Sequence, residues 1–306
     1  NLALAVIDEQ HRFGTTQRRK LVRKDNIAPH LLSMTATPIP RTLALTMYGD
    51  LDLTLLDQSP AGRKPIVTEV VLPNHRELVY EKIRHELKNG RQLYEICPRI
   101  DEPDPDRELA LIAKSVKAEA KRLKERVFPE YSIGILHSRM KPGEKDTVMR
   151  HFKNGDIRIL CATSVVEVGV NVPNATVIVI EGAERFGLAQ LHQLRGRVMR
   201  STHQAYCYAF IETGSAKSVA RLQALSSAKN GFELAELDLA QRGSGSLGGA
   251  RQWGVSDIAM EALKNLKMVE AARTEARSLI DENQTLSKYP VLKTEVERKK
   301  HSLHFE

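Results

Sequence analysis

The chain has 306 residues, and its 46 lysines and arginines against 38 acidic residues give a formal net charge of +8. This modest basic excess favours an anionic partner such as a nucleic acid, while the lack of a long apolar stretch or an opening secretory segment argues against membrane binding. The three cysteines, Cys97, Cys161 and Cys207, stand singly in apolar runs, so we expect buried thiols in a reducing cytoplasm rather than disulfides or metal ligands.

The chain opens on an apolar run, residues 2–8, which ends in Asp8-Glu9 and continues into Gln10 and His11. An apolar strand ending in Asp-Glu is how P-loop nucleotide hydrolases present one carboxylate to Mg²⁺ and a second one to the attacking water. The two acids suit a plain turn or helix cap equally well. The phosphate-binding loop G-x-x-x-x-G-K-S/T does not occur in the 306 residues, so we expect the downstream part of a nucleotide-driven motor.

A second expected strand, residues 30–35, leads into Thr35-Ala36-Thr37-Pro38, and helical patterns lie near residues 15–24 and 40–47. Hydroxyl groups at a strand end can respond to phosphate charge. The alternative is N-capping of the helix that begins near Pro40, since Thr followed by Pro is typical of a helix start.

Pro60-Ala61-Gly62 indicates a linker, and beyond it strand-like apolar runs alternate with helical patterns as far as Ile211. Such alternation predicts the α/β class, a parallel sheet with flanking helices. An acidic loop, residues 101–106, precedes a long charged helix that ends near Val127. The expected strands lie near residues 66–72, 92–96, 132–137, 157–163, 176–181 and 205–211.

Polar and charged residues follow two of these strands, where helix N-termini and backbone N–H groups can bind phosphate without reading sequence. These residues are Arg139, Lys141 and Lys145 after the first strand and Thr163, Ser164 and Glu167 after the second. For the two lysines, a solvated helix face is an equally good interpretation. Beyond Thr213 we expect only helices, interrupted by a glycine cluster at 243–249 that suits either a closely packed loop or a flexible linker.

Six stretches in this order resemble the superfamily 2 helicases, and among them the RecG family of bacterial branch-migration helicases. They are DEQHRFG at 8–14, MTATPIPRTLALTMYGDLD at 34–52, PAGRKPI at 60–66, LHSRMKPGEKDTVMRHFKNGD at 136–156, ATSVVEVGVNVPNA at 162–175 and ERFGLAQLHQLRGRVMR at 184–200. Transcription-repair coupling factors share several of these blocks, but Gln10, residues 48–52 and residues 94–98 favour the RecG family.

The resemblance implies RecA-like parallel sheets in a two-lobed motor. Residues 1–58 would be the C-terminal part of the first lobe, residues 61–212 a complete second lobe, and residues 213–306 a helical-hairpin translocation motif followed by C-terminal helices.

The resemblance also implies roles at the nucleotide. Asp8 would hold Mg²⁺ through its water shell, Glu9 would activate the hydrolytic water, and Arg197 and Arg200 would stabilise phosphate charge from the other lobe. Residues that couple ATP to the rest of the motor would be Gln10, His11, Thr35, Thr37, Gly169 and Gln193. Met199 stands where this family usually has Gly, and this is a departure from the family pattern. Gly permits a close backbone approach that Met does not, so the departure affects where Arg200 is placed.

The expected DNA contacts are Arg139, Lys141, Thr163, Ser164 and Glu167, and the expected translocation-coupling residues are Arg221, Arg242 and Gln252. Ser246 and Gly248 depart from the acidic-then-leucine pattern usual in that last segment.

From the resemblance we expect an ATP-dependent DNA helicase or translocase, with ATP and Mg²⁺ as cofactors, that acts on stalled forks and Holliday junctions in recombination and repair. Its partner would be double-stranded and branched DNA bound without sequence preference, and a single-stranded-DNA-binding protein is a candidate partner. We expect a monomer in the bacterial cytoplasm at the nucleoid, inactive as an isolated fragment. The alternatives are a translocase like the transcription-repair coupling factor and a non-catalytic DNA-binding remnant.

Overall fold

The computed structural model describes residues 3–8, 30–35, 64–98, 115–163, 172–198, 202–212, 215–228, 231–235 and 266–300, together with residues 54, 56, 62 and 237. The chain divides into two compact units, one made of Asn1–Leu56 with Arg242–Glu306 and the other of Asp57–Gln241. No helix in the described ranges is long and apolar enough to cross a membrane.

The first unit contains a parallel pair of strands, β1 (Leu4–Ile7) and β2 (His30–Ser33), as the apolar runs predicted. Leu4 lies opposite His30 and Ile7 opposite Ser33, so both strands end at the same edge. The helices α10 (Leu266–Glu282) and α11 (Pro290–Lys300) also belong to this unit.

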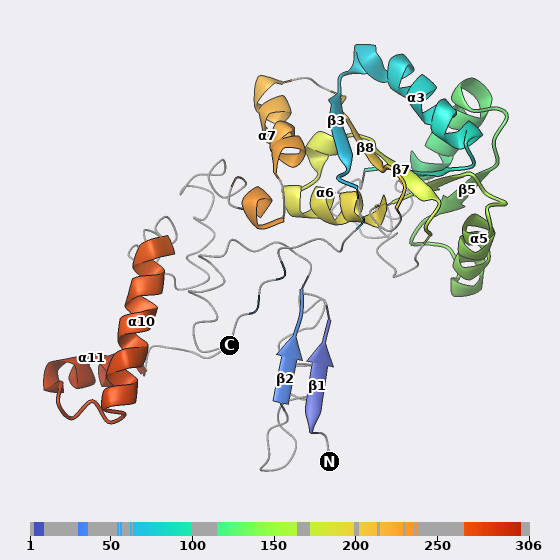
Figure 1. Cartoon of the computed structure of the whole chain (residues 1–306). Coiled ribbons are helices and arrows are strands. Elements are labelled where there is room, and N and C mark those ends of the chain that lie inside the picture. Colours follow the sequence, from blue (N-terminus) through green and yellow to red (C-terminus); the bar gives the residue numbers. More distant parts are fainter. Residues whose placement is uncertain are drawn as a thin grey trace. The chain divides into compact units, whose positions relative to one another are not determined.

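The second unit is built on a six-stranded parallel sheet in the order β3-β8-β7-β4-β6-β5. Figure 1 shows β3, β8 and β7 side by side in this sheet. This confirms the predicted α/β class with a RecA-like parallel sheet. The central strands β4, β6 and β7 are buried along their whole length, as expected of parallel strands covered on both faces. The strands are β3 (Val67–Val71), β4 (Gln92–Ile96), β5 (Ile133–Leu136), β6 (Ile159–Ala162), β7 (Ala175–Ile180) and β8 (Tyr206–Phe210).

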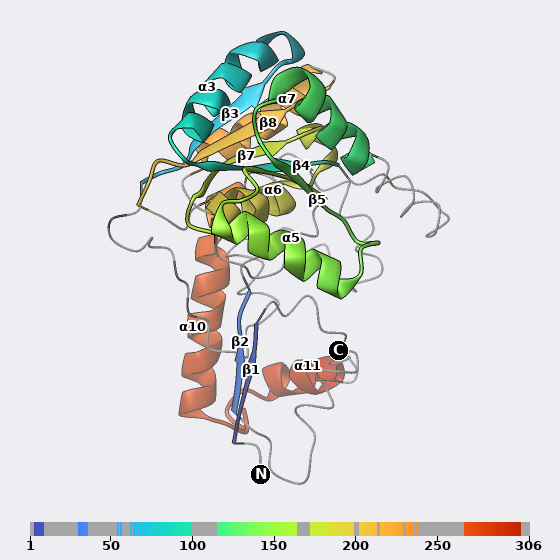
Figure 2. The ribbon, with the colours of Figure 1, turned by 90° about the vertical axis from the view of Figure 1, so that its right-hand side faces the viewer.

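Helices cover both faces of this sheet. On one face, α3 (Arg76–Lys88) and a helix at residues 115–122, which ends in the wide turn Leu123–Val127, share a core with Leu93 and Val177. On the other face, α5 (Pro142–Asn154), α6 (Leu188–Arg195) and α7 (Ala216–Ser227) pack over Ile96 and Ile178. Figure 2 shows α3 on one side of the sheet and α5 and α6 on the other.

Local sequence sets the bounds of α5. Pro142 occupies the first turn, where no backbone N–H is needed, and the Glu144 carboxylate accepts a hydrogen bond from the Lys141 N–H at 3.1 Å. The helix ends at Gly155, whose φ of 86° is in the left-handed region that suits glycine.

The three cysteines are buried, as predicted. Cys97 and Cys161 lie on the face covered by α3, whereas Cys207 lies on the opposite face.

Because all six strands are parallel, their carboxyl ends meet at one edge of the sheet. The segments that follow β4, β5, β6, β7 and β8 therefore all leave from this edge. Three of the described candidate residues, Arg139, Lys141 and Thr163, follow strand ends at this edge.

Candidate nucleotide and DNA interface

In the first unit, the strand ends place two predicted residues side by side. Asp8 directly follows β1 and Thr35 lies two residues beyond β2, and the Met34 N–H donates to the Ile7 carbonyl at 2.7 Å. Both side chains are exposed. Carboxylate and hydroxyl oxygens are ligands that Mg²⁺ accepts, directly or through water, so this strand edge suits the predicted metal role. Glu9, Gln10, His11 and Thr37 lie outside the described residues.

In the second unit, the ends of β5 and β6 form a basic edge. Leu136 pairs with Ala162, and the Thr163 N–H donates to the Leu136 carbonyl, so Thr163 lies beside the loop that begins at His137. Arg139 and Lys141 are exposed in that loop. The Lys145 ammonium donates to the Ser138 carbonyl at 3.0 Å and thereby holds the loop.

Two buried polar atoms at this edge lack a hydrogen-bond partner among the described residues, the hydroxyl of Thr163 and Nδ1 of His137. Burial, reinforced by Lys117, Lys145 and Arg139, lowers the pKa of His137, so its ring is uncharged at neutral pH. Sequence reasoning did not select His137, although it is the last residue of the strand predicted at 132–137 and lies in the family-like stretch 136–156. Ser164, Glu167 and Gly169 lie outside the described residues.

The closely spaced arginines divide between two environments. Arg195, at the end of α6, is 9% exposed, and its guanidinium donates to the Leu225 carbonyl of α7 at 2.5 Å. Burial and the neighbouring Arg195 lower the pKa of His192 to about 4, so this histidine is neutral. Gln193 and Arg197 are half-buried, and Arg197 lies in the short turn Gly196–Val198 that continues α6. Met199 and Arg200 lie outside the described residues.

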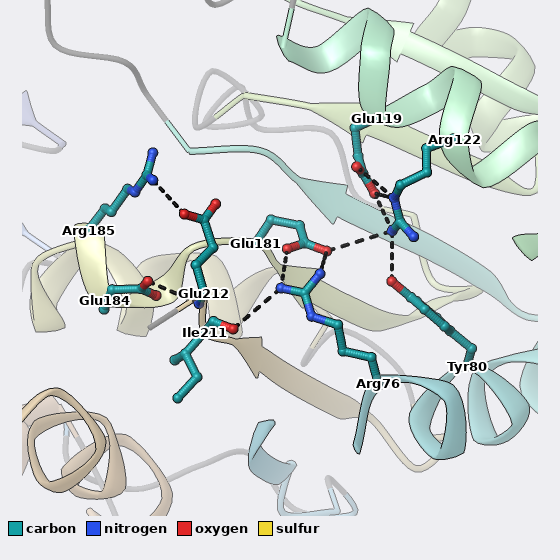
Figure 3. Close-up of polar contacts among 9 residues, drawn as sticks. All are labelled: Arg76, Tyr80, Glu119, Arg122, Glu181, Glu184, Arg185, Ile211 and Glu212. Atoms are coloured by element: carbon teal, nitrogen blue, oxygen red, sulfur yellow. Dashed lines mark hydrogen bonds and ion pairs between the residues drawn. The ribbon is translucent and has the colours of Figure 1, made fainter. Parts of the chain in front are cut away.

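The segment between β7 and α6, residues 181–187, is tied to its surroundings by a polar network that the sequence did not reveal (Figure 3). Arg76 of α3 holds Glu181 through a paired contact, Nη1 to Oε1 at 3.1 Å and Nη2 to Oε2 at 2.9 Å. Arg185 contacts Glu212 at 2.5 Å, and Glu184 accepts a hydrogen bond from the Glu212 N–H at 3.0 Å. Arg76 and Glu181, for example, are 105 positions apart, so no local spacing could have predicted their pairing.

Arg221, a predicted coupling residue, joins α7 to the same segment. Its guanidinium donates to the Phe186 carbonyl at 3.0 Å and to the Glu184 carbonyl at 2.8 Å. The structure thus places Arg221 against the segment that leads into α6 and Arg197. Arg242 and Gln252 lie outside the described residues, so their predicted association with Arg221 stays a prediction.

Comparisons with known proteins show what this chain is similar to in sequence and fold. Residues 77–202 match the family model described as the helicase conserved C-terminal domain. The chain is 47% identical over 293 residues to the ATP-dependent DNA helicase RecG of Synechocystis sp. and 43% identical over 280 residues to that of Thermotoga maritima. These alignments cover 95% and 91% of this chain but only 34% and 35% of the relatives, so the chain spans about a third of their length.

A solved structure of RecG bound to a three-way DNA junction is similar as well, with a TM-score of 0.66 and 40% sequence identity. The match covers 88% of this chain and 34% of that one.

Proposed function

Since the chain is a segment of the RecG helicase type, we propose that it forms part of a motor that uses ATP hydrolysis to move along double-stranded DNA at branched structures. The observation that carries the proposal is the similarity to RecG over nearly the whole of this chain. The placement of the candidate residues at strand ends supports it, because ligands of open parallel sheets bind outside the carboxyl ends of the strands.

At the nucleotide, the candidate residues would bind the metal ion, activate the water and stabilise the phosphate charge. Asp8 would hold Mg²⁺ through water, and Glu9 would orient and deprotonate the hydrolytic water. Mg²⁺ would supply charge neutralisation at the phosphates. Arg197 and Arg200 would stabilise the charge that develops as the terminal phosphate is transferred.

At the DNA, the basic edge after β5 and β6 would hold backbone phosphates. Arg139 and Lys141 supply mobile positive charges, and the backbone N–H groups that open α5 supply fixed donors. The hydroxyl of Thr163 and Nδ1 of His137 lie buried at the same edge, without a hydrogen-bond partner among the described residues. Contacts to backbone phosphates carry no sequence information, which supports binding without sequence preference.

We extend the proposal to the whole protein as a monomer in the bacterial cytoplasm at the nucleoid, with a single-stranded-DNA-binding protein as candidate partner. The similarity to bacterial RecG proteins supports the bacterial setting, and the remaining points rest on the family resemblance of the sequence.

The test uses the 306-residue chain and a three-way DNA junction. We expect weak binding whose affinity falls with salt, and the combined change of Arg139 and Lys141 to alanine should reduce the salt slope by roughly 1 per side chain. Lys153→Ala is the matched control, because Lys153 is exposed at the other end of the same helix. An equal effect of the control, or a salt-independent affinity, would contradict the proposed interface.

A further inference from the structure

Glu95 is a carboxylate in the middle of a buried strand. It is 1% exposed, and both of its carboxylate oxygens lack a hydrogen-bond partner within the described part of the chain. Its neighbours in the sheet are Cys161 of β6 and Val179 of β7. Its side chain lies on the face that α3 and the helix at residues 115–122 cover. A buried ionised carboxylate without a donor is very unfavourable, so something must compensate it.

Two further carboxylates face Glu95, Glu119 from the helix at residues 115–122 and Glu181 from the end of β7. One oxygen of each of the three lies within 4.8 Å of the others. Arg76 is paired with Glu181, and Arg122 is paired with Glu119 through Nη2 at 2.6 Å (Figure 3). Three carboxylates therefore share two guanidinium groups.

The other titratable groups around Glu95 in the described part of the chain add no positive charge. They are the thiols of Cys97 on the same strand and Cys161 on β6, and the phenol of Tyr80 on α3, which accepts a hydrogen bond from Arg122 at 2.7 Å. Burial raises the pKa of each of these three groups, so they are neutral at physiological pH. With all three carboxylates ionised, the cluster has a net charge of −1.

We propose that Glu95, Glu119 and Glu181 form a buried proton-binding site, in which Glu95 holds the proton at neutral pH. One proton brings the cluster to neutrality, whereas a divalent cation would leave an excess positive charge in a buried place. Burial, followed by Glu181 and Glu119, raises the pKa of Glu95 well above its ordinary value, in agreement with this assignment.

Protonation of Glu95 stabilises the ion pair between Arg76 and Glu181. Ionised Glu95 would repel Glu181 at short range and compete for the same arginines. Glu181 opens the segment that leads to α6, so loss of the proton would loosen the entry to this helix. The site makes the second unit sensitive to alkaline pH through a residue that touches neither the proposed DNA edge nor the nucleotide residues.

The direction of the pH effect follows from the raised pKa. In the unfolded chain Glu95 ionises near its ordinary pKa of 4.5, while in the folded chain it keeps its proton to higher pH. Below the pKa of the unfolded chain, Glu95 is protonated in both states, so its ionisation does not change the free energy of unfolding. Between the unfolded and the folded pKa, the free energy of unfolding falls as the pH rises. Above the folded pKa the effect is constant.

The test compares equilibrium unfolding of the 306-residue chain with that of Glu95→Gln between about pH 5 and about pH 8. We expect the unfolding constant of the parent, divided by that of the variant, to rise about tenfold per pH unit until the folded pKa is reached. Glu69→Gln is the matched control, because Glu69 is more exposed and pairs with Lys82 at the surface. Glu95→Leu, which needs no hydrogen bond, should remove the same pH dependence if the glutamine variant does not fold.

A second readout uses the infrared carbonyl band of a protonated carboxyl group. At neutral pH this band should be present in the parent and in Glu69→Gln and absent in the Glu95 variants. Absence of the band from the parent, or parallel pH profiles for the parent and the Glu95 variants, would overturn the proposal. So would one bound Mn²⁺ per chain that is lost in Glu95→Gln, because the site would then hold a cation.

Discussion

Replacement of Arg221 by alanine tests how α7 is joined to the segment before α6. The change removes two hydrogen bonds from a charged donor, to the Phe186 carbonyl at 3.0 Å and to the Glu184 carbonyl at 2.8 Å. Nothing in alanine can replace them. Both contacts are partly buried, so water can reach the two carbonyl oxygens only in part.

The size of the effect follows from these contacts. A hydrogen bond to a charged group contributes about 1.5–3 kcal/mol, and partial access of water lowers the cost of removing it. We therefore expect the two together to lower the free energy of unfolding by about 2–3 kcal/mol. A domain of ordinary stability, about 5–15 kcal/mol, stays folded after such a loss.

Urea unfolding of the 306-residue chain measures this loss. Arg150→Ala is the control, because it removes the same charge from an exposed position whose side-chain contact is a 3.4 Å hydrogen bond to Thr147. We expect the control to change stability by at most about 0.5 kcal/mol. If Arg221→Ala is no more destabilised than the control, the two hydrogen bonds do not brace the segment.

A protein completed with its upstream lobe tests the coupling role separately. We expect Arg221→Ala to retain DNA-stimulated ATP hydrolysis within several-fold of the parent and to lose junction unwinding, because the brace lies beside α6 rather than at the phosphates. Parallel loss of both activities would mean that Arg221 acts by holding Arg197 in place instead.

Two further expectations concern chemistry and packing. The purified 306-residue chain should hydrolyse ATP no faster than its Glu9→Gln variant, since its sequence has no phosphate loop, and DNA-stimulated turnover that disappears in Glu9→Gln would contradict this. Gly134→Ala should destabilise the fold by about 1–2 kcal/mol, because an added Cβ would lie 2.9 Å from a methyl group of Ile157. Gly143→Ala is the control: the added Cβ in the first turn of α5 would meet nothing within 4 Å, so this change should be neutral or stabilising. Thermal unfolding of the two glycine variants decides the second point.

The strands were predictable because parallel strands buried on both faces are continuous apolar runs. The run predicted at 92–96 is β4, Gln92–Ile96, and the run predicted at 176–181 is β7, Ala175–Ile180. The same sequence hid Glu95, because a polar residue that alternates with apolar ones normally marks a strand face open to solvent. Burial of this side chain depends on α3 and the helix at residues 115–122, which cover the face from elsewhere in the chain.

Arg195 of α6 shows what helical periodicity can and cannot predict. Leu188, Leu191 and Arg195 recur at the i, i+3, i+7 spacing of one helix face, and all three are buried. The pattern therefore contained the signal that Arg195 faces the core. It could not show which group would satisfy the buried charge.

That group is the Leu225 carbonyl near the end of α7, where the last carbonyls of a helix have no partner within the helix and a positive charge is favourable. Arg221 of α7 in turn donates to the segment before α6. The two arginines thus join α7 both to the end of α6 and to the segment that leads into α6. These charged contacts join α7 to α6 and to the segment before it in addition to the connecting chain, which is why Arg221→Ala is expected to separate the two proposed activities.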